Sequence, residues 1–104
     1  MAFAEWLSIT HHARGIRVSC LCPQGVQTSM LAQAVALPSG KAILASGAVL
    51  SPEEVAQAAV RGLADERFLI LPHPEVATYL QRRAQDHERW LSAMRSLQDK
   101  VGWD

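Results

Sequence analysis

A short apolar run closed by a proline constrains the fold of this 104-residue chain more than any other feature. Residues 16–22 (Ile-Arg-Val-Ser-Cys-Leu-Cys) are long enough for a buried strand and too short for a helix. Gly15 stands before the run and can end a helix with a positive φ. Pro23 stands after it and cannot donate to a sheet ladder. The pattern predicts a helix over residues 1–14, followed by a buried strand.

A second apolar run, Phe68 to Leu71, has the composition of a strand covered on both faces. A helix start precedes it: Ser51 can cap, Pro52 suits the first helical position, and Glu54 completes a capping box. A strand, a helix and another strand in this order predict a right-handed crossover between parallel strands. The expected fold class is therefore α/β, with two parallel strands and flanking helices.

The segment from residue 29 to 50 allows two interpretations. It carries one ionised side chain, Lys41, and its first apolar residues predict a short helix broken at Pro38-Ser39-Gly40. As a plain structural element, it would be a helix and a loop that cover the core. As a functional element, it would be a mobile substrate lid, which needs an apolar lining and flexible joints.

The C-terminal region, residues 74–101, has apolar residues at helical spacing and predicts helix throughout. The polar pair Gln85-Asp86 could divide it into two helices, and the pattern leaves one helix or two open.

Composition excludes several classes of protein. With 49% hydrophobic residues, the chain is apolar enough to fold. Its net charge of zero offers no basic stripe for nucleic acid and no polybasic membrane patch. No apolar run approaches the ~20 residues that span a bilayer. Two cysteines form no disulfide framework, so we expect a reduced, cytoplasmic setting.

Two pairs of potential metal ligands favour ordinary structural roles. Cys20 and Cys22 point to one face of the predicted strand, but no second pair of ligands lies at a suitable spacing. Thiols packed as small hydrophobic groups are the favoured interpretation. His11 and His12 would point about 100° apart on a helix, which favours a solvated helix end. We therefore expect no metal site.

The loop from Pro23 to Thr28 is the best candidate for ligand contact. It follows the carboxyl end of the first predicted strand, and ligands of open α/β sheets bind just beyond such ends.

The sequence around this loop resembles one enzyme family. Arg-Gly-Ile-Arg-Val-Ser-Cys-Leu-Cys-Pro-Gln-Gly-Val-Gln-Thr, ending at Thr28, is similar to the sixth strand and following loop of short-chain dehydrogenases/reductases. The family usually has Pro-Gly-x-Val-x-Thr, whereas Gln24 stands here at the glycine position and Gly25 follows it. Weaker similarity covers most of the chain. The resemblance implies that the chain is the C-terminal portion of a Rossmann-type fold and that it begins after the family's Tyr-x-x-x-Lys pair.

The resemblance also implies an organisation and a set of contacts. The chain would be one partial domain: helix 1–14, strand and cofactor-side loop 15–28, lid 29–50, helix and strand 51–71, and helical region 74–101. A complete enzyme would transfer hydride between NAD or NADP and a small-molecule alcohol or carbonyl. The implied cofactor contacts are Pro23, Gly25 and Val26 through the backbone and Thr28 through its hydroxyl; Met30 and Leu31 would belong to the lid.

No catalytic residues are predicted. The single tyrosine, Tyr79, has Arg83 where the family's lysine would stand, and no glycine-rich phosphate loop occurs. Whether the chain is an enzyme stays open at this stage. We expect this chain alone to be inactive and to bind no cofactor.

The alternative is a non-enzymatic α/β interaction module that associates with itself. One edge of the strand predicted over residues 16–22 would be bare, and a bare apolar edge is a template for pairing. The expected assembly is a homodimer or a larger homo-oligomer.

Overall fold

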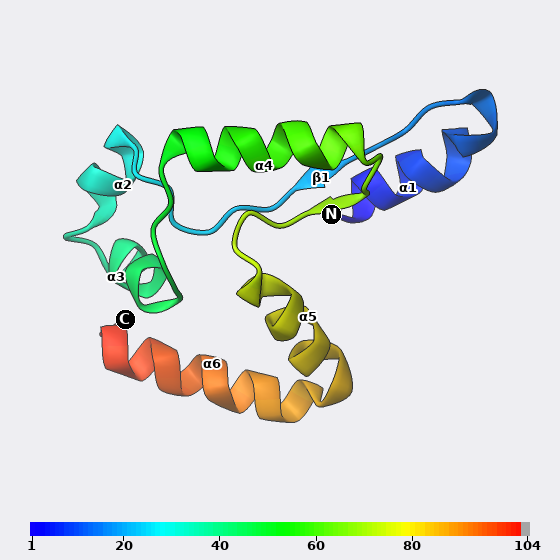
Figure 1. The fold of residues 1–104 in the computed structure, drawn as a ribbon. Coiled ribbons are helices and arrows are strands. Elements are labelled where there is room, and N and C mark those ends of the chain that lie inside the picture. The colour runs from blue at the N-terminus through cyan, green and yellow to red at the C-terminus, as the bar shows by residue number, and fades with distance from the viewer. Residues whose placement is uncertain (103–104) are drawn as a thin grey trace.

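The computed structural model describes residues 1–102 and shows an α/β arrangement made mostly of helices (Figure 1). Its elements in chain order are α1 (Ala2–His11), a 3₁₀ turn η1 (His12–Arg14), β1 (Cys20–Leu21), α2 (Ser29–Ala34), α3 (Pro38–Ala45), α4 (Pro52–Ala64), β2 (Leu69–Ile70), α5 (Glu75–Gln85) and α6 (His87–Val101).

The two strands form a parallel sheet, as the sequence predicted. Cys20 pairs with Leu69 and Leu21 pairs with Ile70. The strands are shorter than the predicted runs 16–22 and 68–71. The reason lies upstream of β1, where the chain runs beside a polar turn instead of another strand. There Arg17 forms an ion pair with Glu66 at 3.2 Å, and the Ser19 hydroxyl donates to the carbonyl of Arg67 at 2.7 Å.

Helix α4 covers one face of the sheet (Figure 1). Its start is the predicted capping box: the Glu54 amide donates to Ser51 Oγ at 3.2 Å, and the Ser51 amide donates to Glu54 Oε2 at 2.8 Å. Near its end, buried Gly62 lies against the Ile70 side chain. A Cβ atom built on this glycine would lie 2.5 Å from Ile70 Cδ1, so the absence of a side chain lets α4 approach β2 closely.

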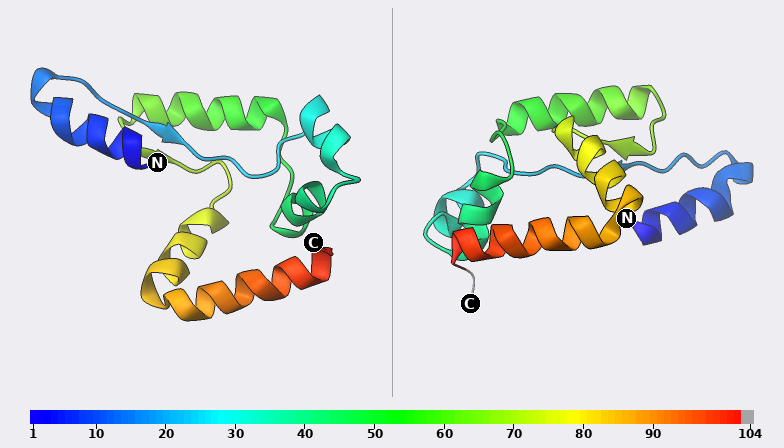
Figure 2. Two further views of the ribbon diagram at one scale, coloured as in Figure 1. Left: turned by 180° about the vertical axis from the view of Figure 1, so that it is seen from behind. Right: turned by 90° about the horizontal axis from the view of Figure 1, so that it is seen from below.

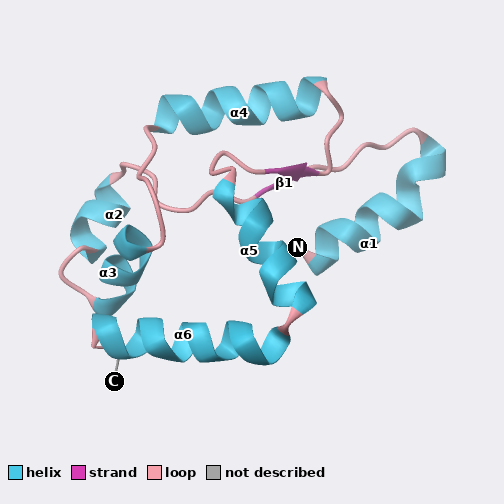
Figure 3. Ribbon diagram, turned by 60° about the horizontal axis from the view of Figure 1, so that its bottom comes forward, coloured by secondary structure: helices cyan, strands magenta, loops and turns pink. Residues whose placement is uncertain are grey.

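Two predictions about helix boundaries are resolved by the structure. The predicted short helix ends before Pro38-Ser39-Gly40 as expected, at Ala34, but Pro38 then starts a second helix, α3, instead of a loop, because proline at the first helical position lacks only an N–H that would be unpaired anyway. The C-terminal region is two helices, which meet at Asp86 (Figure 3). Asp86 caps α6 by accepting a hydrogen bond from the Arg89 amide at 2.9 Å.

Little of the chain is buried. Among residues 1–102, Ile70 is the one buried apolar side chain, 6% exposed. Helix α1 lies apart from the other helices (Figure 2), and its Phe3 and Ile9 are 71% and 81% exposed. The radius of gyration is 16.0 Å. A compact chain of this length has a radius of about 13 Å, so the structure is open.

No helix within residues 1–102 is both long enough and apolar enough to cross a lipid bilayer.

Candidate functional site

The loop that follows β1 is held on one side by the segment that leads into α4. Val26 forms a parallel bridge with Leu50. The Gln27 amide donates to the Leu50 carbonyl at 2.8 Å, and the Leu50 amide donates to the Gly25 carbonyl at 3.0 Å. The loop is therefore hydrogen-bonded along its backbone and has a defined path.

His73 holds the same loop from the other side. Its imidazole is 1% exposed, and Nδ1 accepts a hydrogen bond from the Gln24 amide at 3.0 Å. Nε2 lies 2.9 Å from the Ala48 carbonyl and 3.2 Å from the Gly25 carbonyl. Because Nδ1 accepts from an N–H, the ring proton must be on Nε2, which donates to the two carbonyls. The buried His73 ring thus joins three parts of the chain: the loop, the end of the segment 29–50 and the residues after β2.

A side chain at Gly25 would be tightly packed against its neighbours. Gly25 is buried, and a Cβ atom there would lie 3.2 Å from the side chains of Ile43 and Val49. Such a contact is too close without movement of α3 or of the segment after it. The loop therefore lies directly under the C-terminal part of the lid segment.

Thr28 begins α2 as its N-cap. Its Oγ1 accepts a hydrogen bond from the Leu31 amide at 3.3 Å, so the capping role occupies a lone pair and leaves the hydroxyl proton free to donate to a ligand. The side chain is exposed. The geometry of Thr28 therefore allows it to cap α2 and to contact a ligand at the same time.

The other predicted site residues are near one another in the chain and differ in exposure. Pro23 is exposed, Val26 is half-buried, and the lid residues Met30 and Leu31 lie on α2, where Met30 is 79% exposed. The structure brings Gly25, Val26 and the Leu50 backbone together, while Met30 points to solvent.

His73 is the residue at this site that the sequence prediction missed. In the sequence, Pro72-His73-Pro74 indicates only a break between the strand over residues 68–71 and the helical region that follows. The available signal was its place: a histidine directly after a strand, at the same edge of the sheet where the loop after β1 begins.

The two cysteines lie beside this loop: Cys20 is in β1, and Cys22 directly follows the strand. Their Sγ atoms are 3.6 Å apart, and both residues are partly buried. Burial raises the pKa of the Cys22 thiol, and the hydrogen bond with Cys20 raises that pKa further. Both effects favour the protonated thiol over the reactive thiolate.

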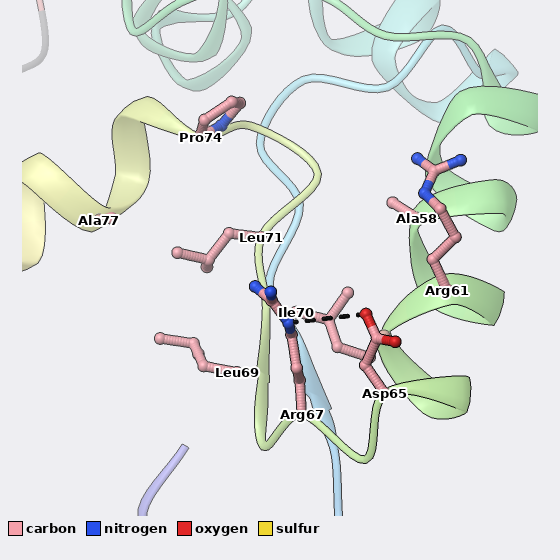
Figure 4. A pocket seen from close by; sticks show the side chains of 10 residues that line it. Ala58, Arg61, Asp65, Arg67, Leu69, Ile70, Leu71, Pro74 and Ala77 are labelled. Atoms are coloured by element: carbon pink, nitrogen blue, oxygen red, sulfur yellow. Dashed lines mark ion pairs between the residues drawn. The ribbon is translucent and has the colours of Figure 1, made fainter.

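A separate hollow of about 460 Å³ runs along β2, between α4 and the start of α5 (Figure 4). Arg61, Asp65 and Arg67 lie on its α4 side, and Asp65 pairs with Arg67 at 3.8 Å. None of the predicted site residues lines this hollow. The exposed ion pair partly neutralises its charge, so the hollow offers no strong attraction for an anion.

The chemistry that the loop can support is binding. Residues 23–28 contribute backbone groups, the carboxamides of Gln24 and Gln27 and the Thr28 hydroxyl, and the nearby imidazole of His73 is committed to backbone partners. Within residues 1–102, no three of His, Cys, Asp and Glu are grouped to hold a metal ion.

Comparisons with known proteins found no family model, no curated protein and no solved structure that matches this chain.

Proposed function

We propose that this chain supplies the cofactor-side loop and the substrate cover of an NAD(P)-dependent short-chain dehydrogenase/reductase. The Rossmann-type fold, the cofactor and the small-molecule alcohol or carbonyl substrate are all part of this proposal. It rests on the sequence resemblance and on the arrangement of the parallel strands, the crossover and the loop.

One observation carries the proposal: the loop at the carboxyl end of β1 is held in a fixed path by backbone partners. Leu50 binds it on one side and His73 on the other. Recognition of a flat nicotinamide ring through backbone groups requires such a path, because a mobile loop would lose conformational entropy on binding. In this proposal Pro23, Gly25 and Val26 face the ring, and the Thr28 hydroxyl donates to the carboxamide or a phosphate.

Helices α2 and α3 form the cover in this proposal. The two helices contact each other, and α3 also contacts α6 (Figure 1). Met30, which is largely exposed on α2, and its neighbour Leu31 are the apolar residues offered to a substrate.

The proposal is tested with the two halves of the cofactor as separate probes. The chain alone is expected not to hold an intact NAD or NADP, so the probes are added at high concentration to detect weak binding: nicotinamide mononucleotide, added to isotope-labelled protein, should shift the amide NMR signals of Gly25, Val26 and Thr28, whereas adenosine monophosphate should not. Thr28→Val keeps the shape and removes the hydroxyl, which should weaken binding by about 1 kcal/mol, or several-fold. The matched control is Thr10→Val on exposed α1. Equal shifts with both probes, or an unchanged affinity in Thr28→Val, would contradict the proposal.

The chain by itself should not turn over NADH or NADPH with alcohols or ketones. Its tyrosine, Tyr79, donates its hydroxyl to the Ser46 carbonyl at 3.1 Å and has Arg83 four residues later. Clear turnover by the purified chain, independent of added metal, would refute this part of the proposal.

A second candidate function is self-association through exposed apolar surface. It is favoured because the solvent-accessible area of the chain is larger than that of a compact monomer. The chain exposes 7580 Å². A compact monomer of this length exposes roughly 5,800 Å², so the excess is about 1,800 Å². An obligate interface buries roughly 1,000–2,500 Å² on each partner, and a second copy would therefore cover the excess.

Sedimentation at micromolar concentration tests this candidate. A homodimer or larger homo-oligomer that dissociates on dilution is the expected result. A folded monomer at every concentration would refute it, and would leave the cofactor proposal untouched.

A further inference from the structure

We propose that Cys20 and Cys22 form a two-sulfur site for one soft, thiophilic cation of the Cu(I) class. The site is independent of the proposed cofactor function. Cys20 lies in β1 and Cys22 directly follows it, with its amide continuing the pairing by donating to the Ile70 carbonyl at 3.0 Å, so the two side chains point to the same face.

The sulfur–sulfur distance favours a bridging ion over a disulfide. With metal–sulfur bonds of ~2.3 Å, two sulfurs on one tetrahedral or trigonal ion stand about 3.8–4.0 Å apart. The Sγ atoms of Cys20 and Cys22 are already 3.6 Å apart, so an ion could enter with little movement. A disulfide would require the sulfurs to close to ~2.05 Å, and residues two apart on a strand have Cα atoms about 6.6 Å apart, near the upper limit for that bond.

The number of ligands selects the kind of ion. Structural Zn²⁺ needs four ligands and catalytic Zn²⁺ needs three from the protein, but residues 1–102 place no third candidate ligand with the two cysteines. Soft thiolates favour Cu(I), which accepts two or three sulfur ligands. Both cysteines are partly exposed, so a small external thiol can complete the coordination.

The surroundings of the sulfurs are apolar. By the register of the sheet, Cys20 lies beside Leu69, on the face opposite α4. Figure 4 shows Leu69 and Leu71 on the side of β2 away from α4, while Ile70 points toward that helix. An apolar environment of this kind disfavours hard cations, which must keep water or oxygen ligands.

The binding step involves no oxidation or reduction. Two S–H bonds lose their protons to the buffer, two metal–sulfur bonds form, and the ion enters and remains as Cu(I). The chain has no other cysteine, so the expected stoichiometry is one ion per chain.

The test uses Cu(I) in competition with the coloured chelator bicinchoninate. The full chain should withdraw one Cu(I) per chain, and Cys20→Ser or Cys22→Ser should lower the affinity roughly 100-fold or more, since one thiolate remains. The matched control is Ser19→Cys/Cys20→Ser, which has the same composition and places its two thiols on opposite faces of the strand. It should bind as weakly as the single-cysteine variants. Retained affinity in this control, or one ion per two chains, would overturn the proposal.

A measurement on the unaltered chain avoids any effect of a substitution on folding. Alkylation followed by mass spectrometry should label both thiols in the free chain and neither thiol in the Cu(I)-loaded chain. A loaded chain in which one cysteine is still labelled at its free rate would overturn the two-sulfur site.

Discussion

Replacing His73 by alanine should release the loop after β1. The imidazole accepts from the Gln24 amide at 3.0 Å and donates to the Ala48 carbonyl at 2.9 Å, with the Gly25 carbonyl sharing that proton at 3.2 Å. His73→Ala removes both ring nitrogens at once: the acceptor of the Gln24 amide and the donor to the carbonyls. The loop then keeps its hydrogen bonds to Leu50 and loses those that tie it to the chain after β2.

The magnitude follows from burial. Each buried polar group left without a partner costs about 1–3 kcal/mol, and here the Gln24 amide and the Ala48 carbonyl lose theirs, while the Gly25 carbonyl keeps its hydrogen bond from the Leu50 amide. The ring is 1% exposed, so its removal also leaves a cavity in place of packed atoms. We expect the free energy of unfolding to fall by about 2–5 kcal/mol.

Hydrogen exchange of the Gln24 amide is the most direct assay, with chemical denaturation as the measure of global stability. The Gln24 amide should be protected in the unaltered chain and exchange rapidly in His73→Ala. His12→Ala, at an exposed histidine in η1, is the matched control and should change neither quantity appreciably. If His73→Ala keeps Gln24 protected and unfolds at the same denaturant concentration as the control, the imidazole does not hold the loop.

Three further predictions concern α4 and β1. Gly62→Ala places a methyl 2.5 Å from Ile70 and should lower stability by about 1–3 kcal/mol in thermal unfolding; an unchanged melting temperature would show that α4 shifts freely. Hydrogen bonds from the Ser51 amide and hydroxyl lower the pKa of Glu54. Its contribution to stability is therefore complete above the ordinary glutamate pKa and is lost as the pH falls through the lowered folded-state value; Glu54→Gln should remove this acid-dependent part of an unfolding titration. Because burial and Cys20 raise the pKa of the Cys22 thiol, iodoacetamide should label Cys22 more slowly in the folded chain than in the denatured chain at the same pH; equal rates would contradict this.

Local signals in the sequence predicted the elements that local chemistry determines. The capping box of Ser51 and Glu54 marked the start of α4, and Gly15, with φ of 80°, ends the first helical segment as expected. These features depend on residues a few positions apart, so the sequence contains all the information needed. The parallel pairing of two apolar runs was likewise predicted, because the intervening helix leaves few other ways to connect them.

The lengths of the strands and the role of His73 depend on residues that are distant in the chain. Ile16 is apolar but exposed, since the turn opposite it offers the Glu66 carboxylate and the Arg67 carbonyl instead of a strand. His73 meets Gln24 across 49 positions, and no local pattern indicates such a contact. The contact by which His73 holds the loop could therefore be found only in the three-dimensional structure, whereas the loop itself was predicted from the sequence.

The clamp on the loop, formed by Leu50 and His73, and the exposed apolar surface can be separated by experiment, because they depend on different forces. The loop is ordered by hydrogen bonds from its backbone to the Leu50 backbone and to the His73 imidazole, and His73 is placed by β2, whose Ile70 packs against Gly62 of α4. None of these contacts involves α1, where Phe3 and Ile9 expose most of their surface. Dilution that dissociates a self-associated form should therefore leave the Gln24 amide protected. If protection disappears together with the oligomer, the clamp needs the second copy, and the loop is ordered by assembly instead of by this chain's own fold.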